Sequence, residues 1–229
     1  MFEEINEAHN IVWGVRRQLE KDGSSFKTPT TKRTAYYIRS ELNEAFDIWM
    51  RESDPSEARN NVRKDTLTDE CADALMMMLT LLGDAILSER TFSHALEEWV
   101  SAHNDNLEQS LNHCFKTAEA VIDMIDYDEP YLQLTMEMTV ALCAIRPDCI
   151  KRVPYRLAKL IAKNSPFLSK ASALAIADGS AYMDVEMSNK IQAEKTAWLD
   201  KWDAIIGRKI QKMIDAETLR DYQNSLIIN

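Results

Sequence analysis

The chain has 229 residues, of which 45% are hydrophobic and 28% are charged, and its formal net charge at pH 7 is −10. This hydrophobic content is enough for a sizeable core, so the composition argues against a disordered chain. The negative charge argues against a broad contact with a nucleic-acid backbone, because such binding is driven by clustered Lys and Arg. We expect a folded protein that forms no stable complex with nucleic acid.

Helices are expected to dominate the fold, which we predict to be all-α. Only 5 Gly and 6 Pro are present, and 11 Met are spread through the chain. No segment alternates β-branched and polar residues. The sequence contains no uninterrupted apolar stretch of about 18 residues and no secretory leader pattern, so we expect a cytoplasmic protein without membrane contact. The four cysteines are expected to be reduced thiols of the core: Cys71, Cys114, Cys143 and Cys149.

The first two predicted helices each carry an apolar stripe. Residues 2–21 form a helix whose inner side is Ile5, Ala8, Val12, Val15 and Leu19, and Asp22-Gly23 ends it. A polar loop follows over residues 24–32. The second helix covers residues 35–52, and its predicted stripe is Ile38, Leu42, Ala45, Phe46 and Trp49. Pro55 stops this helix, because a proline disfavours the helical conformation of the residue before it.

The third helix is predicted to begin at Leu67, because Thr66 and Asp69 have the spacing of a capping box. It runs to about Ser88, and Thr91 or Ser93 is expected to cap a fourth helix. The remaining chain is expected to stay helical. Its predicted segments are a seam from Leu111 to Ile125, residues 131–145, 150–163 and 167–178, and two long C-terminal helices, the first with Ile191, Trp198, Trp202 and Ile205.

Two pairs of carboxylates stand out on the second and third helices. Glu41 and Glu44 are three residues apart, and so are Glu70 and Asp73. A step of three residues places both acids of a pair on one side of a helix, so two antiparallel helices would direct four carboxylates into one volume. Four close anions require a hard cation such as Mg2+.

The surroundings of the second pair favour a functional interpretation. A single acidic pair is typical of a solvent-exposed helix face. The third helix, however, is apolar nearly all round beyond Asp73, as Leu75, Met77 and Met78 illustrate. Buried carboxylates need a partner, so we interpret the two pairs together as a metal site.

The order Glu41-x-x-Glu44, spacer, Glu70-x-x-Asp73 resembles the signature of the MazG-like all-α nucleoside triphosphate pyrophosphohydrolases, which are related to the dimeric dUTPases. The resemblance covers roughly residues 1–107 and implies a MazG-like helical bundle as the catalytic domain, with residues 108–229 as a C-terminal helical extension packed on it. It also implies Mg2+, or Mn2+ in its place, held by the four acids. The implied reaction cleaves a (deoxy)nucleoside triphosphate between the α and β phosphates, which releases nucleoside monophosphate and pyrophosphate. One acid would activate water, and the motif leaves open which one.

The resemblance suggests further substrate contacts. Lys64 or Arg63 in the interhelical loop, and Asn104 or Asn106 after the fourth helix, lie where relatives contact phosphate or sugar. Trp13 is a candidate for stacking on a base. The family also implies a homodimer or a homotetramer. Two alternatives stay open: a dUTPase-type enzyme selective for one deoxynucleotide, and a non-enzymatic acidic helical scaffold or nucleic-acid mimic that occupies a basic partner.

Overall fold

The computed structural model describes residues 1–21, 29–53, 65–83, 89–102, 107–163 and 185–207. These residues form eight α-helices and no strand, which confirms the expected all-α class. None of the described helices is long and apolar enough to cross a membrane. In chain order the helices are α1 (Phe2–Lys21), α2 (Thr31–Ser53), α3 (Leu67–Leu82), α4 (Glu89–Ala102), α5 (Leu107–Asp126), α6 (Leu132–Ile145), α7 (Asp148–Lys163) and α9 (Val185–Ile206).

The chain divides into two compact units, Met1–Val153 and Pro154–Asn229. The first unit contains α1 to α6 and the beginning of α7, so it continues well past residue 107, where the resemblance placed the end of the catalytic domain. In the second unit, α9 carries Trp198 and Trp202 with their ring centroids 6.2 Å apart, and Trp202 is buried. The division into a catalytic domain and an extension stays a prediction.

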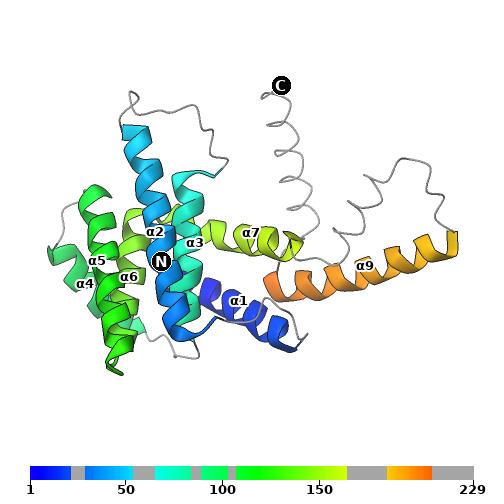
Figure 1. Cartoon of the computed structure of the whole chain (residues 1–229), viewed down its shortest axis with the longest axis horizontal. Coiled ribbons are helices and arrows are strands. Elements are labelled where there is room, and N and C mark those ends of the chain that lie inside the picture. Colours follow the sequence, from blue (N-terminus) through cyan, green and yellow to red (C-terminus); the bar gives the residue numbers. More distant parts are fainter. Residues whose placement is uncertain (22–28, 54–64, 84–88, 103–106, 164–184, 208–229) are drawn as a thin grey trace. The chain divides into compact units, whose positions relative to one another are not determined.

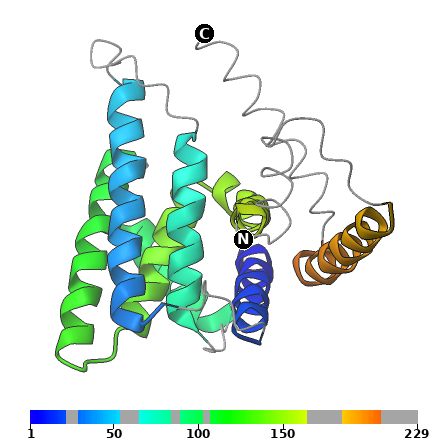
Figure 2. The same ribbon diagram turned by 45° about the vertical axis from the view of Figure 1, so that its right-hand side comes forward.

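Four helices of the first unit form a closed ring of contacts. Helix α2 packs on α3 and α5, and α6 packs on the same two helices from the other side. Figures 1 and 2 show α2 and α3 side by side and running in opposite directions. Helix α1 packs against α3, and α4 packs against α6. Because α3 contacts α1, α2 and α6, it lies at the centre of the unit.

The apolar stripes explain this packing. Every residue of the predicted α1 stripe is buried, and α3 is buried nearly all round, as its apolar composition predicted. The α2 prediction was partly wrong. Ile48 joins Ile38, Leu42 and Ala45 in the core. Phe46 and Trp49 are only half-buried, and their rings contact each other in a tilted arrangement with centroids 5.3 Å apart.

Several helix ends differ from the predicted ones for local reasons. Helix α2 begins at Thr31, because Thr30 caps it: its Oγ1 accepts a hydrogen bond of 3.3 Å from the amide of Arg33. Helix α3 ends at Leu82 rather than near Ser88, because Gly83 has a φ of 59°, which a helix cannot continue through. Helices α4 and α7 begin two or more residues earlier than predicted. The predicted segment 167–178 and the last C-terminal helix lie outside the described residues.

The first turn of α3 is fixed by a buried carboxylate. Thr66 and Asp69 form the predicted capping box, and Arg152 of α7 donates a hydrogen bond from Nε to Asp69 Oδ1. Asp69 is 0% exposed. Burial alone would raise the pKa of Asp69, but the hydrogen bonds from Arg152 and Thr66 outweigh it and lower the pKa. The start of α3 is therefore tied to a segment that follows about 80 residues later.

All four cysteines are free and buried, as predicted. Burial raises the pKa of Cys71 and of Cys114. A hydrogen bond with Cys143, together with burial, raises the pKa of Cys149. The thiols of Cys71, Cys114 and Cys149 stay protonated at neutral pH, and all four cysteines serve as small apolar core groups.

The Asp69→Asn variant tests the anchor of α3. We expect a loss of about 1.5–3 kcal/mol in the free energy of unfolding at pH 7, because a charge-assisted hydrogen bond is removed from a buried site. Since the folded-state pKa of Asp69 is lowered, its contribution is complete above the unfolded pKa of about 4 and is lost as the pH falls through the folded pKa. Urea unfolding at pH 7 and at lower pH should therefore show the two proteins converging on acidification. The exposed Asp123→Asn control should show neither effect.

Candidate metal centre

The structure brings three of the four predicted acids together. Glu41 and Glu44 project from α2 toward the first turns of α3, where Glu70 lies. One carboxylate oxygen of each residue lies within 4.8 Å of one from each of the other two. Glu70 is 4% exposed, and Glu41 and Glu44 are half-buried. The antiparallel packing of α2 on α3 thus gathers side chains that are up to 29 positions apart in the sequence.

The position of Glu70 near the start of α3 contributes to this arrangement. The positive end of the helix dipole stabilises a carboxylate in the first turn. The neighbouring Asp69 is held by Thr66 and Arg152, which fixes the backbone that carries Glu70. Glu70 is therefore the most rigidly placed of the three acids.

The three carboxylates fit a small divalent cation. Two oxygens on opposite sides of Mg2+ lie about 4.2 Å apart, since each is about 2.1 Å from the ion. Adjacent ligands of the same ion lie closer together, at about 3.0 Å. The oxygens of Glu41, Glu44 and Glu70 all lie within 4.8 Å of one another, so rotations of the half-buried Glu41 and Glu44 side chains could bring them to a common ion. Three carboxylates would leave coordination positions for water or a phosphate oxygen, as a Mg2+ site normally does.

Asp73 is placed differently from the other three predicted acids. It is half-buried on α3, three residues after Glu70, and its oxygens are not part of the converging group. Asp has one methylene fewer than Glu, so the same helix face does not give it the same reach. Spacing alone predicted the face of Asp73 but not its participation in the group.

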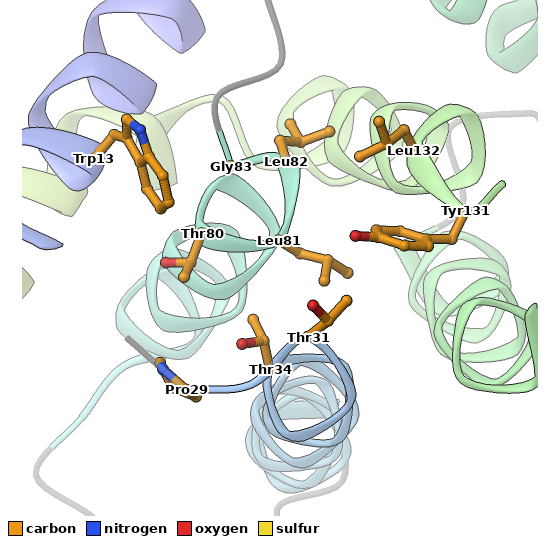
Figure 3. A pocket seen from close by; sticks show the side chains of 10 residues that line it. All are labelled: Trp13, Pro29, Thr31, Thr34, Thr80, Leu81, Leu82, Gly83, Tyr131 and Leu132. Atoms are coloured by element: carbon orange, nitrogen blue, oxygen red, sulfur yellow. The ribbon is translucent and has the colours of Figure 1, made fainter. Parts of the chain in front are cut away.

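Trp13 lines a pocket of about 360 Å³ in the first unit, at the end of α3 that lies away from the carboxylates. Figure 3 shows Trp13 on one side of the last turn of α3, and Tyr131 on the other. Thr34 and Thr80 also belong to the lining. The described lining residues carry no charged side chain, so the pocket suits an uncharged group rather than a phosphate.

The remaining predicted contacts lie outside the described residues: Arg63, Lys64, Asn104 and Asn106. His9 has Nε2 at 2.8 Å from the carbonyl oxygen of Gly83, which ties α1 to the end of α3. The sequence analysis missed the buried Arg16. Helical periodicity could have predicted its burial, because position 16 lies one turn after Val12 on the inner side of α1.

The Glu70→Gln variant tests the metal centre. We expect the dissociation constant for Mn2+, measured by calorimetry at fixed ionic strength, to rise at least about tenfold. Loss of a residue that only hydrogen-bonds to a metal ligand already lowers metal affinity by about that factor. Without metal, the variant should be as stable as the wild type or more stable, since like charges at close range repel. Glu129→Gln, at an exposed position, is the control and should bind Mn2+ as the wild type does. Equal Mn2+ affinity in Glu70→Gln would contradict the assignment.

The candidate centre is interpreted from the chemistry of its own residues. Comparison with protein-family models, with curated proteins and with solved structures found no match.

Proposed function

We propose that the protein is a Mg2+-dependent hydrolase that cleaves (deoxy)nucleoside triphosphates between the α and β phosphates. The observation that carries the proposal is the convergence of Glu41, Glu44 and Glu70 on one volume, with Glu70 almost fully buried. Carboxylates held this close, beside a buried apolar helix, are stabilised by a cation that bridges them. The order of the acids along the chain is the one that resembles the MazG-like enzymes.

The proposed roles follow from position. Glu41, Glu44 and Glu70 would hold the cation from two helices. A bound Mg2+ would neutralise phosphate charge and increase the acidity of the attacking water. Asp73, on the same face of α3 but outside the converging group, is the candidate to accept the proton of that water.

The pocket beside Trp13 is the proposed place for the base. Thr34, in its lining, precedes Glu41 by seven residues, which corresponds to about 10 Å along α2. A nucleotide that lies along this helix would direct its phosphates toward the carboxylates. The aromatic face of Trp13 accepts any base. The hydroxyls of Thr34 and Thr80 donate to the carbonyl oxygens of Thr30 and Met76, so toward a base they would act as acceptors.

The non-enzymatic alternative, an acidic scaffold or nucleic-acid mimic, fits the site less well. Such a protein displays its acids to a basic partner, which requires them to be exposed. Glu70 is 4% exposed and therefore cannot present its charge at a surface. The net charge of −10 alone does not distinguish the two functions.

A panel of nucleoside triphosphates tests the proposed activity. Each nucleotide is incubated with the full chain and Mg2+, or with chelator, and pyrophosphate release is measured together with the nucleotide product. We expect nucleoside monophosphate and pyrophosphate only when the metal is present. Turnover restricted to dUTP would identify the dUTPase-type alternative. Failure to hydrolyse any member of the panel would refute the proposal.

Two variants separate the roles of the acids. Glu41→Gln should lower kcat about 100-fold or more and weaken Mn2+ binding, because it removes a metal ligand. Asp73→Asn should lower kcat similarly while Mn2+ binding stays close to that of the wild type, because Asp73 lies outside the converging group. Circular dichroism verifies that both variants keep the helical fold. Full activity in both folded variants would overturn the assignment.

The Trp13→Ala variant tests the base site. We expect KM to rise about tenfold with a small change in kcat, because base stacking on an aromatic side chain contributes about 1–3 kcal/mol. Trp13→Phe keeps an aromatic face and should lie closer to the wild type. An unchanged KM in Trp13→Ala would refute the role of Trp13 in base binding and would not affect the assignment of the metal centre.

A further inference from the structure

Arg16 is a buried cation in the interface between α1 and α3. Its residue is 2% exposed, and it lies on the same side of α1 as Val12 and Leu19, which belong to the core. A guanidinium stays protonated at any physiological pH, so this charge cannot be removed by deprotonation. A buried charge is expensive unless an anion or several hydrogen-bond acceptors meet it.

The described residues supply little of what Arg16 requires. Its Nη2 lies 3.9 Å from Met77 Sδ, and a thioether sulfur is a weak acceptor. Its Nε is buried and has no hydrogen-bond partner in the part of the chain that the structure describes. Burial lowers the pKa of Arg16, and Glu20, one turn later on α1, partly opposes this through its charge. The guanidinium therefore has donor capacity for an anionic ligand.

Arg16 faces the side of α3 that carries the acids. Its neighbour Met77 follows Asp73 by four residues and Glu70 by seven, so the three side chains share one face of the helix. Seven residues correspond to about 10 Å along the helix axis. Met77 is half-buried, so part of the side chain beside the guanidinium is open to solvent.

We propose that Arg16 binds a phosphate oxygen of a polyphosphate chain that also reaches the metal site at Glu41, Glu44 and Glu70. The inference rests on the proposed function and names the chemistry of the substrate: an anion with several phosphates, which spans from the metal to the guanidinium. The phosphate supplies the acceptor that Nε lacks and gives Nη2 a stronger acceptor than the thioether, in the forked geometry that guanidinium groups form with phosphate. The same chemistry occurs in a nucleoside triphosphate and in an inorganic polyphosphate.

Binding of inorganic tripolyphosphate to the full chain in Mg2+ tests the inference. We expect Arg16→Met and Arg16→Gln to raise the dissociation constant, measured by calorimetry, about 10- to 100-fold. Arg16→Lys keeps the charge but loses the fork, and should lie in between. Arg90→Gln removes one positive charge from an exposed position on α4 and should bind as the wild type does. A deoxynucleoside triphosphate in the same titrations distinguishes a nucleotide from a free polyphosphate as the preferred ligand.

Thermal unfolding without ligand separates a binding role from a structural one. If Arg16 stabilises the fold, its replacement should lower the melting temperature. For Arg16→Met we expect an unchanged or higher melting temperature, because an inadequately compensated buried charge is replaced by an apolar side chain of similar length. The inference would be overturned if Arg16→Met had a lower melting temperature and Arg16→Lys bound tripolyphosphate as the wild type does. Arg16 would then be assigned to the core.

The two proposals fail in distinguishable ways. If the wild type binds tripolyphosphate through Arg16 but hydrolyses no nucleotide, the anion site stands and the proposed activity falls. If the wild type hydrolyses nucleotides and Arg16→Gln retains both its KM and its tripolyphosphate affinity, the activity stands and the role of Arg16 is refuted.

Discussion

The packing of α2 against α3 is the constraint on which the candidate site depends. It brings three carboxylate oxygens within 4.8 Å of one another, where each pair of ionised groups repels by about 1–4 kcal/mol, depending on the effective dielectric. Apolar contacts of Leu42, Ala45 and Leu75, all buried, offset this repulsion. This repulsion opposes folding, and under the proposed function a bound cation would offset it.

Helix α3 serves the core and the candidate site at once. Its first two turns carry Glu70 and Asp73, and the rest is buried against α1, α2 and α6. The capping box and Arg152 hold the first turn of α3 in place. Glu70 and Asp73 are therefore positioned by a rigid helix at the centre of the unit. A functional group on such an element is placed accurately, but any substitution that loosens α3 will affect folding and metal binding together.

Local patterns in the sequence predicted the parts of the structure that depend on local physics. The apolar stripe of α1 and the Thr66–Asp69 cap were correct, because they follow from helical periodicity and from hydrogen bonds three residues apart. The contact of Arg152 with Asp69 was not foreseen, because it joins residues 83 positions apart. The carboxylate pairs indicated a common face, yet Asp73 stays outside the group, because a shared helix face does not determine where each carboxylate ends.

The burial of every thiol has a practical consequence for spectroscopy. The chain has four cysteines, and all of them are enclosed in the first unit. Alkylating reagents must reach a thiol to react with it, and all four thiols are buried in the folded protein. A single cysteine introduced at an exposed residue such as Tyr127, 79% accessible, would therefore accept a fluorescent or spin label selectively, without removal of the native sulfhydryls.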